Sequence, residues 1–312
     1  MPTTTDDPLP DLMRSLRSRT ATDRVKAAKD LGRLGWLARE SLPTLVGLLR
    51  DDDAKVREAA AHAIGQMGPE ALPALSGMLA HNDKYVRRNA VWAMGKLGPQ
   101  AKGALTALCR GLSDADPRTA SGAAQALGNM GSDAADAVPA LTEAMRGTNI
   151  VLCRLAAKAL SQVGEPALDA LIAHLQHTDP FVRGEAALAI GWMGPDGRTA
   201  VPFLARIVRG KQGCSLRDTP PPAGKLDRKA IVAADSVHDD DEEESVTLTP
   251  VSVTPVDGSS PEETCRLYAA QALGRMGALA ATATDDLRVA TRTGSEPVRT
   301  AAIQAIKHIQ GE

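Results

Sequence analysis

The chain has 312 residues, and its composition already excludes several classes of protein. Aromatic residues make up 2% of the chain, too little for the large central core of an ordinary globular enzyme. The formal net charge is −2, whereas domains that bind nucleic acid are usually basic. No stretch approaches the roughly 18 apolar residues of a membrane-spanning helix, so we expect a cytoplasmic protein without a membrane partner.

The N-terminus and the cysteines carry no targeting or metal-binding pattern. Residues 1–7 lack the basic and apolar regions of a signal peptide and are predicted to be a disordered tail. The four cysteines include no CxxC pair, so we expect free thiols rather than disulfides or a zinc site. They are Cys109, Cys153, Cys214 and Cys265.

One short string recurs along the chain and sets its organisation. Its copies are LGRLG (31–35), IGQMG (64–68), MGKLG (94–98), LGNMG (127–131), LSQVG (160–164), IGWMG (190–194), LGRMG (273–277) and the degenerate IKHIQ (306–310). Successive copies lie 30 or 33 residues apart, except for one gap of 83 residues. A fixed period of this length predicts a repeat protein, and the long gap predicts an insertion.

Small and large apolar residues alternate in columns around the string. The position four residues before its first residue is alanine in all eight copies, from Ala27 to Ala302. The position one residue before it is alanine in seven, with Asp30 as the exception. Together with large residues at the first and fourth positions, these columns form one face of a helix, here called helix B. The final glycine is predicted to adopt positive φ and end that helix.

A second, less regular helix precedes each helix B, and we call it helix A. Its prolines recur at one equivalent position, as in ESLPTLVGLLR (40–50). They are Pro43, Pro73, Pro139 and Pro202. Because proline inside a helix removes a hydrogen bond, we expect helix A to be bent.

The turn between the two helices carries an Asp-x-x-Val-Arg signature. Its aspartates are predicted to cap helix B, and its arginines to link neighbouring repeats, so we read this Asp/Arg ladder as structural. The ladder comprises Asp53, Arg57, Asp83, Arg87, Asp179, Arg183, Arg266 and Arg299. Arg24 occupies the same column in the first copy.

The run D-x-x-V-R-x-x-A-A-x-A-L-G-x-M-G resembles the HEAT repeat, and in particular the short HEAT-like repeat of phycobilisome lyases. The resemblance implies an all-α fold: an α-solenoid, a right-handed superhelix of about eight two-helix repeats. Residues 8–209 would hold repeats 1–6 and helix A of repeat 7, and residues 262–312 would hold helix B of repeat 7 and repeat 8. Residues 210–261, rich in Pro, Ser, Thr and acidic residues, are predicted to be a disordered insertion.

A variable and mostly polar stripe on helix B is the candidate binding surface. The resemblance places helix B on the concave side of the solenoid. Two of the three tryptophans of the chain fall on this stripe beside cations, a composition typical of binding hot spots. The candidate partner-binding residues are Lys29, Arg33, His62, Arg88, Trp92, Lys96, Arg154, Lys158, Trp192 and Arg275.

We therefore expect a non-catalytic, monomeric scaffold without cofactor or metal that binds an extended or acidic segment of a protein partner. Phycobilin lyases carry a similar repeat, so handling of a bilin chromophore is the alternative. Deoxyhypusine hydroxylase is also HEAT-like, but its iron site needs His-Glu pairs, and this chain contains no His-Glu dipeptide. A HEAT-like DNA-binding role is disfavoured by the acidic net charge. His174, His177 and Asp179 could collect a metal ion, but surface positions at a helix end explain them more simply.

Overall fold

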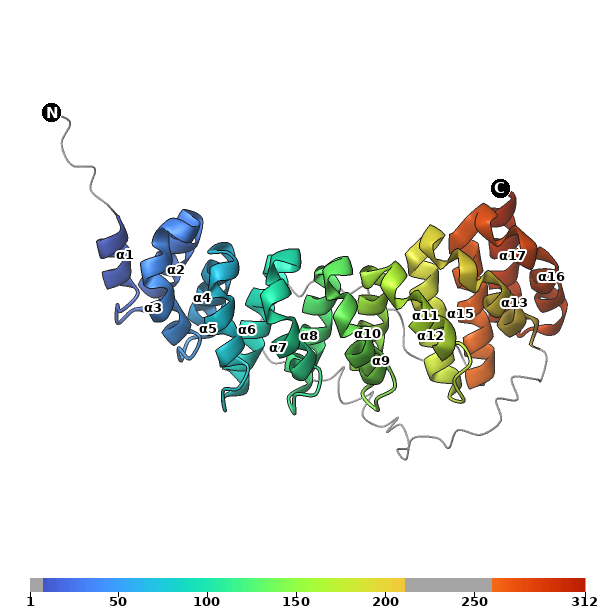
Figure 1. Ribbon diagram of the computed structural model, residues 1–312, viewed down its shortest axis with the longest axis horizontal. Coiled ribbons are helices and arrows are strands. Elements are labelled where there is room, and N and C mark those ends of the chain that lie inside the picture. The colour runs from blue at the N-terminus through green and yellow to red at the C-terminus, as the bar shows by residue number, and fades with distance from the viewer. Residues whose placement is uncertain (1–7, 211–259, 312) are drawn as a thin grey trace. The chain divides into compact units, whose positions relative to one another are not determined.

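The computed structural model describes residues 8–210 and 260–311, and every regular element in those ranges is a helix (Figure 1). The predicted tail at 1–7 and nearly all of the predicted insertion at 210–261 lie outside the described residues. The chain divides into two compact units, residues 1–144 and residues 145–312. The fold is the all-α helical-repeat solenoid expected from the sequence.

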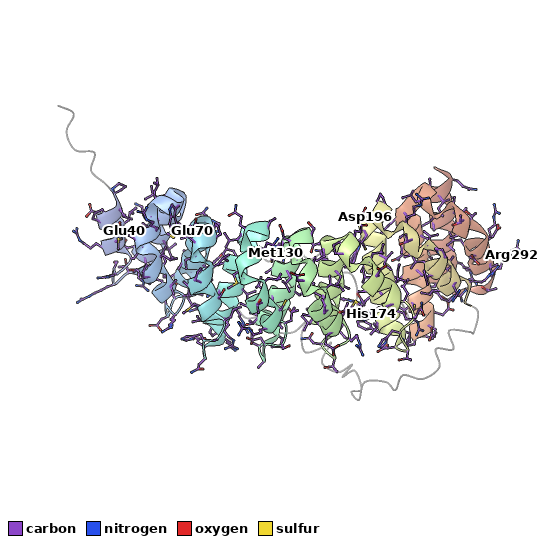
Figure 2. The ribbon with its side chains drawn as sticks, viewed as in Figure 1. Glu40, Glu70, Met130, His174, Asp196 and Arg292 are labelled. Carbon is purple, nitrogen blue, oxygen red and sulfur yellow. The ribbon has the colours of Figure 1, made fainter. Side chains whose placement is uncertain are left out.

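Unit 1 contains the first four repeats and helix A of the fifth. The helix B elements are α2 (Ala21–Leu34), α4 (Ala54–Gln66), α6 (Lys84–Leu97) and α8 (Pro117–Asn129). The helix A elements are α1 (Leu9–Ser15), η1 (Gly35–Ser41) with α3 (Leu42–Leu48), η2 (Pro69–Ala71) with α5 (Leu72–Met78), η3 (Gly98–Ala104) with α7 (Leu105–Gly111), and η4 (Gly131–Ala137) with α9 (Val138–Met145). Each helix B of this unit packs against its own helix A, and α2, α4 and α6 each pack against the next helix B. Glu40 and Glu70, equivalent residues of successive repeats, lie at the same edge of this unit (Figure 2).

Unit 2 continues the same alternation. Its helix B elements are α10 (Ile150–Val163), α12 (Pro180–Met193), α15 (Pro261–Met276) and α17 (Glu296–Gln310). Its helix A elements are α11 (Glu165–His174), η5 (Gly194–Ala200) with α13 (Val201–Arg209), and η7 (Gly277–Ala283) with α16 (Thr284–Thr293). Helix α15 packs directly on α12 although residues 194–260 separate the two in sequence.

Helix A differs from the proline-bent helix that the sequence suggested. In most repeats it consists of a 3₁₀ segment followed by a short α-helix. Pro43, Pro73 and Pro202 stand in the first turn of those α-helices, and Pro139 is the second residue of α9. A proline in the first turn removes no intrahelical hydrogen bond and has a φ suited to a helix start. The prolines therefore begin the α-helical half of helix A instead of bending a continuous helix.

The glycine that closes each recurring string has the backbone conformation predicted for it. Its φ is positive in all seven copies that carry it, from 53° at Gly98 to 96° at Gly68. An L-residue with a side chain rarely adopts such a φ, so glycine can end helix B where the chain turns sharply into helix A.

The predicted apolar face of helix B forms the core of both units. The alanine column from Ala27 to Ala302 is buried in all eight repeats. Leu34 in the first repeat and Ile306 in the last are only partly buried, because a terminal repeat has a neighbour on one side. Asp30, the charged exception next to this face, forms an ion pair with Arg33 at 2.7 Å.

Glycines on helix B allow neighbouring repeats to approach closely. A Cβ built on Gly191 would lie 2.7 Å from the Cα of Ala272, and one built on Gly32 would lie 2.9 Å from the Cα of Ala63. Both distances are shorter than carbon atoms tolerate, so these positions require glycine while α12 and α2 keep their neighbours.

No helix in the described ranges is both long and apolar enough to cross a membrane. Cys109, Cys153 and Cys265 form no disulfide with one another, and Cys214 lies outside the described residues. Burial raises the pKa of the Cys153 thiol to about 12, with a further contribution from nearby Glu185. A thiol held protonated in this way is a poor nucleophile.

Candidate functional site

The candidate site is the set of polar and aromatic residues predicted to face outward on helix B, which we call the B-helix stripe. Within the part of the chain that the structure describes, eight of its ten residues form no ion pair with another repeat: Lys29, Arg33, His62, Trp92, Lys96, Lys158, Trp192 and Arg275. All of these except Trp92, which is half-buried, are exposed. Arg88 and Arg154 have a different environment, described below.

In unit 1 the stripe contains a three-residue cluster on adjacent helices. The rings of His62 on α4 and Trp92 on α6 lie 5.9 Å apart and are tilted by 46°. The Lys96 ammonium, one turn further along α6, lies 4.8 Å from the centre of the Trp92 ring. The indole is thus bracketed by an imidazole from one repeat and a cation from its own, which restricts its rotamers and exposes a mixed aromatic and cationic surface.

Unit 2 has a comparable but smaller pair. Trp192 at the end of α12 is 39% exposed, and the guanidinium of Arg275 on α15 lies 5.7 Å from the centre of its ring. Lys158 on α10 is also exposed. Each unit therefore presents one tryptophan next to a cation on its helix B surface.

Arg88 and Arg154 hold carboxylates of the following repeat. Arg88 donates to both oxygens of Asp116, from Nε at 2.8 Å and from Nη2 at 2.6 Å. Its guanidinium is the largest influence that holds the pKa of Asp116 well below the ordinary range. Arg154 donates from Nε to Oε1 of Glu185 at 3.1 Å. Their charges are thus largely neutralised within the fold, as is that of Arg33 by Asp30, and the positive charge of the stripe comes from the lysines and Arg275.

Glu185 is the most deeply buried carboxylate in the described ranges. It is 0% exposed, and its Oε2 atom has no hydrogen-bond partner. Burial raises its pKa, and the adjacent Arg154 opposes that rise without cancelling it. Tyr268 on α15 belongs to the same cluster, because burial and the charge of Glu185 raise the pKa of its phenol.

The Asp/Arg ladder lies at the start of each helix B. Asp53, Asp83 and Asp179 are the N-caps of α4, α6 and α12, with carboxylates that accept from backbone N–H groups of the first turn. Arg87 binds Asp114 of the next repeat through Nε and Nη2 at 2.8 and 2.9 Å. Arg24 binds Asp51 in the same way at 2.8 and 2.6 Å.

The other ladder arginines have individual partners. Arg183 donates to Glu262, and Arg266 donates to Glu263 and to the carbonyl of Val208. Arg299 makes one long contact of 3.4 Å to the carbonyl of Gly294.

The sequence reasoning did not single out the carboxylates that receive these arginines. Asp51 and Asp114 stand two residues before the N-cap, and each also accepts from the backbone N–H of the capping aspartate. The position two residues before the N-cap is too variable among the repeats to suggest by itself a contact with the arginine. Its residues are Asp51, His81, Asp114, Gly147 and His177.

His174 and His177 do not form part of a metal cluster. Their rings are stacked with centres 6.2 Å apart. His177 accepts the N–H of Asp179 at Nδ1, and burial lowers its pKa. Within residues 8–210 and 260–311, no three His, Cys, Asp or Glu side chains are grouped so that they could hold a metal ion.

Comparisons with known proteins agree with this repeat organisation. The sequence model of HEAT repeats matches residues 9–83, 72–152 and 138–217, which together span more than half of the chain. No curated protein sequence matches the chain significantly.

Several solved structures are similar at low sequence identity. A designed armadillo repeat protein in complex with the peptide (KR)4 is 21% identical, with a TM-score of 0.39, and the match covers 59% of this chain and 99% of that one. The complex of CpcE and CpcF of phycocyanin lyase from Nostoc sp. PCC7120 is 18% identical, with a TM-score of 0.40 and coverage of 99% and 98%. The Escherichia coli protein YibA is 14% identical, with a TM-score of 0.46 and coverage of 96% and 92%.

Proposed function

The chain belongs to the HEAT-repeat family, and from that premise we propose that it is a non-catalytic scaffold that binds a protein partner through its B-helix stripe. The observation that carries the proposal is the cluster on adjacent repeats in which the half-buried Trp92 lies between the exposed His62 and Lys96. Tryptophan beside a cation is over-represented among residues that dominate binding energy. On a solenoid this stripe would lie on the concave side and suit an extended segment.

Charge supports a partner segment with acidic character. Lys29, Lys96, Lys158 and Arg275 are exposed on the stripe, while Glu185, a carboxylate of the same helix face, is buried against Arg154. Complementary charge mainly raises the association rate and selects the partner, so binding should weaken with added salt.

The three tryptophans allow a matched test of this proposal. Trp92→Ala and Trp192→Ala remove the stripe indoles, whereas Trp36→Ala removes an indole that is 44% exposed on the 3₁₀ segment η1, off the stripe. Proteins captured by the wild type would be identified by mass spectrometry, and their affinities would then be measured for each purified variant. We expect Trp92→Ala to lower the affinity for the partner by about tenfold or more, as hot-spot truncations do. Trp36→Ala should leave that affinity unchanged.

Stability measurements separate binding from folding in this test. Trp92→Ala should shift the midpoint of thermal unfolding by no more than about 2–4 °C, because the indole is half-buried and contributes little to the core. If Trp92→Ala unfolds the chain, or if Trp36→Ala weakens the partner equally, the stripe is not the binding surface. A visible chromophore acquired on mixing with a bilin would instead favour the lyase-like alternative.

The same proposal includes a monomeric protein in the cytoplasm. Size-exclusion chromatography with light scattering tests the first point, and cell fractionation tests the second.

A further inference from the structure

The Asp/Arg ladder follows a consistent geometry in unit 1. Arg24 and Arg87 each anchor Nη1 on two backbone carbonyls, five and six residues earlier, and point the Nε/Nη2 edge at an aspartate of the next repeat. That edge binds Asp51 and Asp114, respectively, through both carboxylate oxygens. A guanidinium held in this way is oriented for a planar, two-oxygen acceptor.

Arg57 has the same anchor but no carboxylate. Its Nη1 donates to the carbonyls of Asp51 at 2.8 Å and Asp52 at 3.0 Å, again six and five residues earlier. The residue that corresponds to Asp51 and Asp114 in the next repeat is His81. The His81 Nδ1 atom accepts the N–H of Asp83 at 3.0 Å, so the imidazole replaces one function of the aspartate, capping the backbone, but supplies no anion to Arg57.

Three carboxylates at the starts of α4 and α6 are already bound. Both oxygens of Asp51 accept hydrogen bonds from Arg24, and Asp53 accepts two backbone N–H groups at the start of α4. Asp83 caps α6 through the N–H of Tyr85. None of them forms an ion pair with Arg57, whose Nε and Nη2 donate to no atom of the described residues.

The open edge of Arg57 reaches solvent. In the described ranges, the buried side-chain nitrogen and oxygen atoms without a partner are Oε2 of Glu185 and Oγ of Ser295. The unpaired Nε and Nη2 of Arg57 are not among them, so neither atom is fully buried.

Aromatic and cationic groups surround this edge. The Arg57 guanidinium lies 4.9 Å from the ring centre of Tyr85, which is 42% exposed. The Lys84 ammonium and the Arg88 guanidinium each lie 5.2 Å from the same ring. Three cations therefore gather around one exposed aromatic ring.

We propose that the Arg57 edge, flanked by Tyr85 and Lys84, is a binding site for a carboxylate side chain of an acidic partner segment. The acceptor would occupy the place that Asp51 and Asp114 fill in the neighbouring repeats. Those two aspartates, at 2.6–2.9 Å from their arginines, show that the geometry suits a carboxylate. The site rests on the proposed function in needing a protein partner, but it lies at the start of α4 and α6, separate from the stripe indoles.

Filling the site from within the chain provides the test. His81→Asp would give Arg57 the aspartate that Arg24 and Arg87 have, and the new carboxylate could still accept the N–H of Asp83. We expect this variant to unfold roughly 2–4 °C higher than the wild type, as a gain of one part-buried ion pair would produce. We also expect it to bind an acetylated hexaglutamate peptide roughly three- to tenfold more weakly, measured at low salt by isothermal titration calorimetry with the full chain.

Matched variants distinguish the two parallel hydrogen bonds that the Arg57 guanidinium can donate from the effect of its positive charge alone. Arg57→Gln and Arg57→Lys should both lower the affinity for hexaglutamate. Lysine keeps the charge but cannot donate two parallel hydrogen bonds. Lys55→Gln removes one exposed charge from the same turn of α4 and should change the affinity by less than about twofold. Hexaglutamine should not bind, and inorganic phosphate should compete weakly.

The proposal is overturned if wild type and His81→Asp bind hexaglutamate equally, if Lys55→Gln weakens it as much as Arg57→Gln, or if the wild type does not bind it. Phosphate displacing the peptide at comparable concentration would also overturn the assignment to a carboxylate. Trp92→Ala reports on the stripe alone, so failure of the stripe proposal and failure of this site give different results.

Discussion

The guanidinium of Arg87 and the carboxylate of Asp114 join the third and fourth repeats through two hydrogen bonds of 2.8 and 2.9 Å. The two side chains are only 14% and 11% exposed, so water screens their attraction weakly. The bond to Asp114 raises the pKa of Arg87, and Asp114 also accepts the N–H of Asp116. One aspartate thus contributes both to the start of α8 and to the contact between repeats.

Arg87→Ala should lower the free energy of unfolding by about 2 kcal/mol, because it leaves a largely buried carboxylate without its cation. Arg57→Ala is the matched control, since it loses equivalent bonds to backbone carbonyls but leaves no aspartate unpaired. Urea denaturation followed by far-UV circular dichroism measures both. An equal loss for the two variants would show that the carboxylate contributes nothing to stability.

Gly191→Ala should destabilise unit 2 by about 1–3 kcal/mol, because the new methyl group would lie 2.7 Å from the Cα of Ala272 and 2.9 Å from its Cβ. Gly47→Ala, in the exposed part of α3 with nothing within 4 Å of the new Cβ, should instead stabilise the chain by about 0.5–1 kcal/mol. Thermal unfolding of the two variants compares the effects directly. A gain in stability from Gly191→Ala would mean that α12 and α15 can separate without cost.

Glu185 should make stability depend on pH in a recognisable direction. Burial raises its pKa in the folded chain above the ordinary carboxyl value. The folded state therefore binds this proton more tightly than the unfolded state, and the associated stability is present at low pH and decreases as pH rises through the raised pKa. Glu185→Gln keeps a neutral side chain of similar size at all pH values, so the contribution should disappear.

The measurement is the free energy of unfolding between about pH 4 and pH 8, a range that spans ordinary and raised carboxyl pKa values. Relative to the wild type, Glu185→Gln should become more stable as pH rises. Glu40→Gln, at an exposed position, should follow the wild-type curve. Parallel curves for wild type and Glu185→Gln would contradict a raised pKa at this site.

The architecture was predictable because it depends on short-range patterns that repeat. Ala60, Ile64 and Met67 occupy one face of a single helix, and their equivalents recur at the same offsets, so the sequence alone identified the buried face. Gly68 ends that helix with positive φ, which glycine adopts because it has no side chain, so no contact with another repeat is needed to predict it. The structure of helix A was predicted less well, because a proline such as Pro43 is compatible with either a bend or a helix start.

The surface could be predicted only in part. The exposed positions of Lys96 and Trp192 follow from helical periodicity. The engagement of Arg154 with a buried Glu185 does not, because the two residues are 31 positions apart and meet only when adjacent repeats pack in register.

By itself, the sequence determined the repeat, its buried columns and the helix ends, since each of these is set by the spacing of residues within one helix or turn. Only the tertiary structure decided which cations are neutralised. Arg87 pairs with Asp114, whereas Arg57, at the same place in its repeat, pairs with no carboxylate of residues 8–210 and 260–311. The difference arises because His81 stands where the neighbouring repeats have Asp51 and Asp114. Only the packing of separate helices shows that this position meets the arginine, since an ion pair requires the two side chains to lie within a few ångströms of each other.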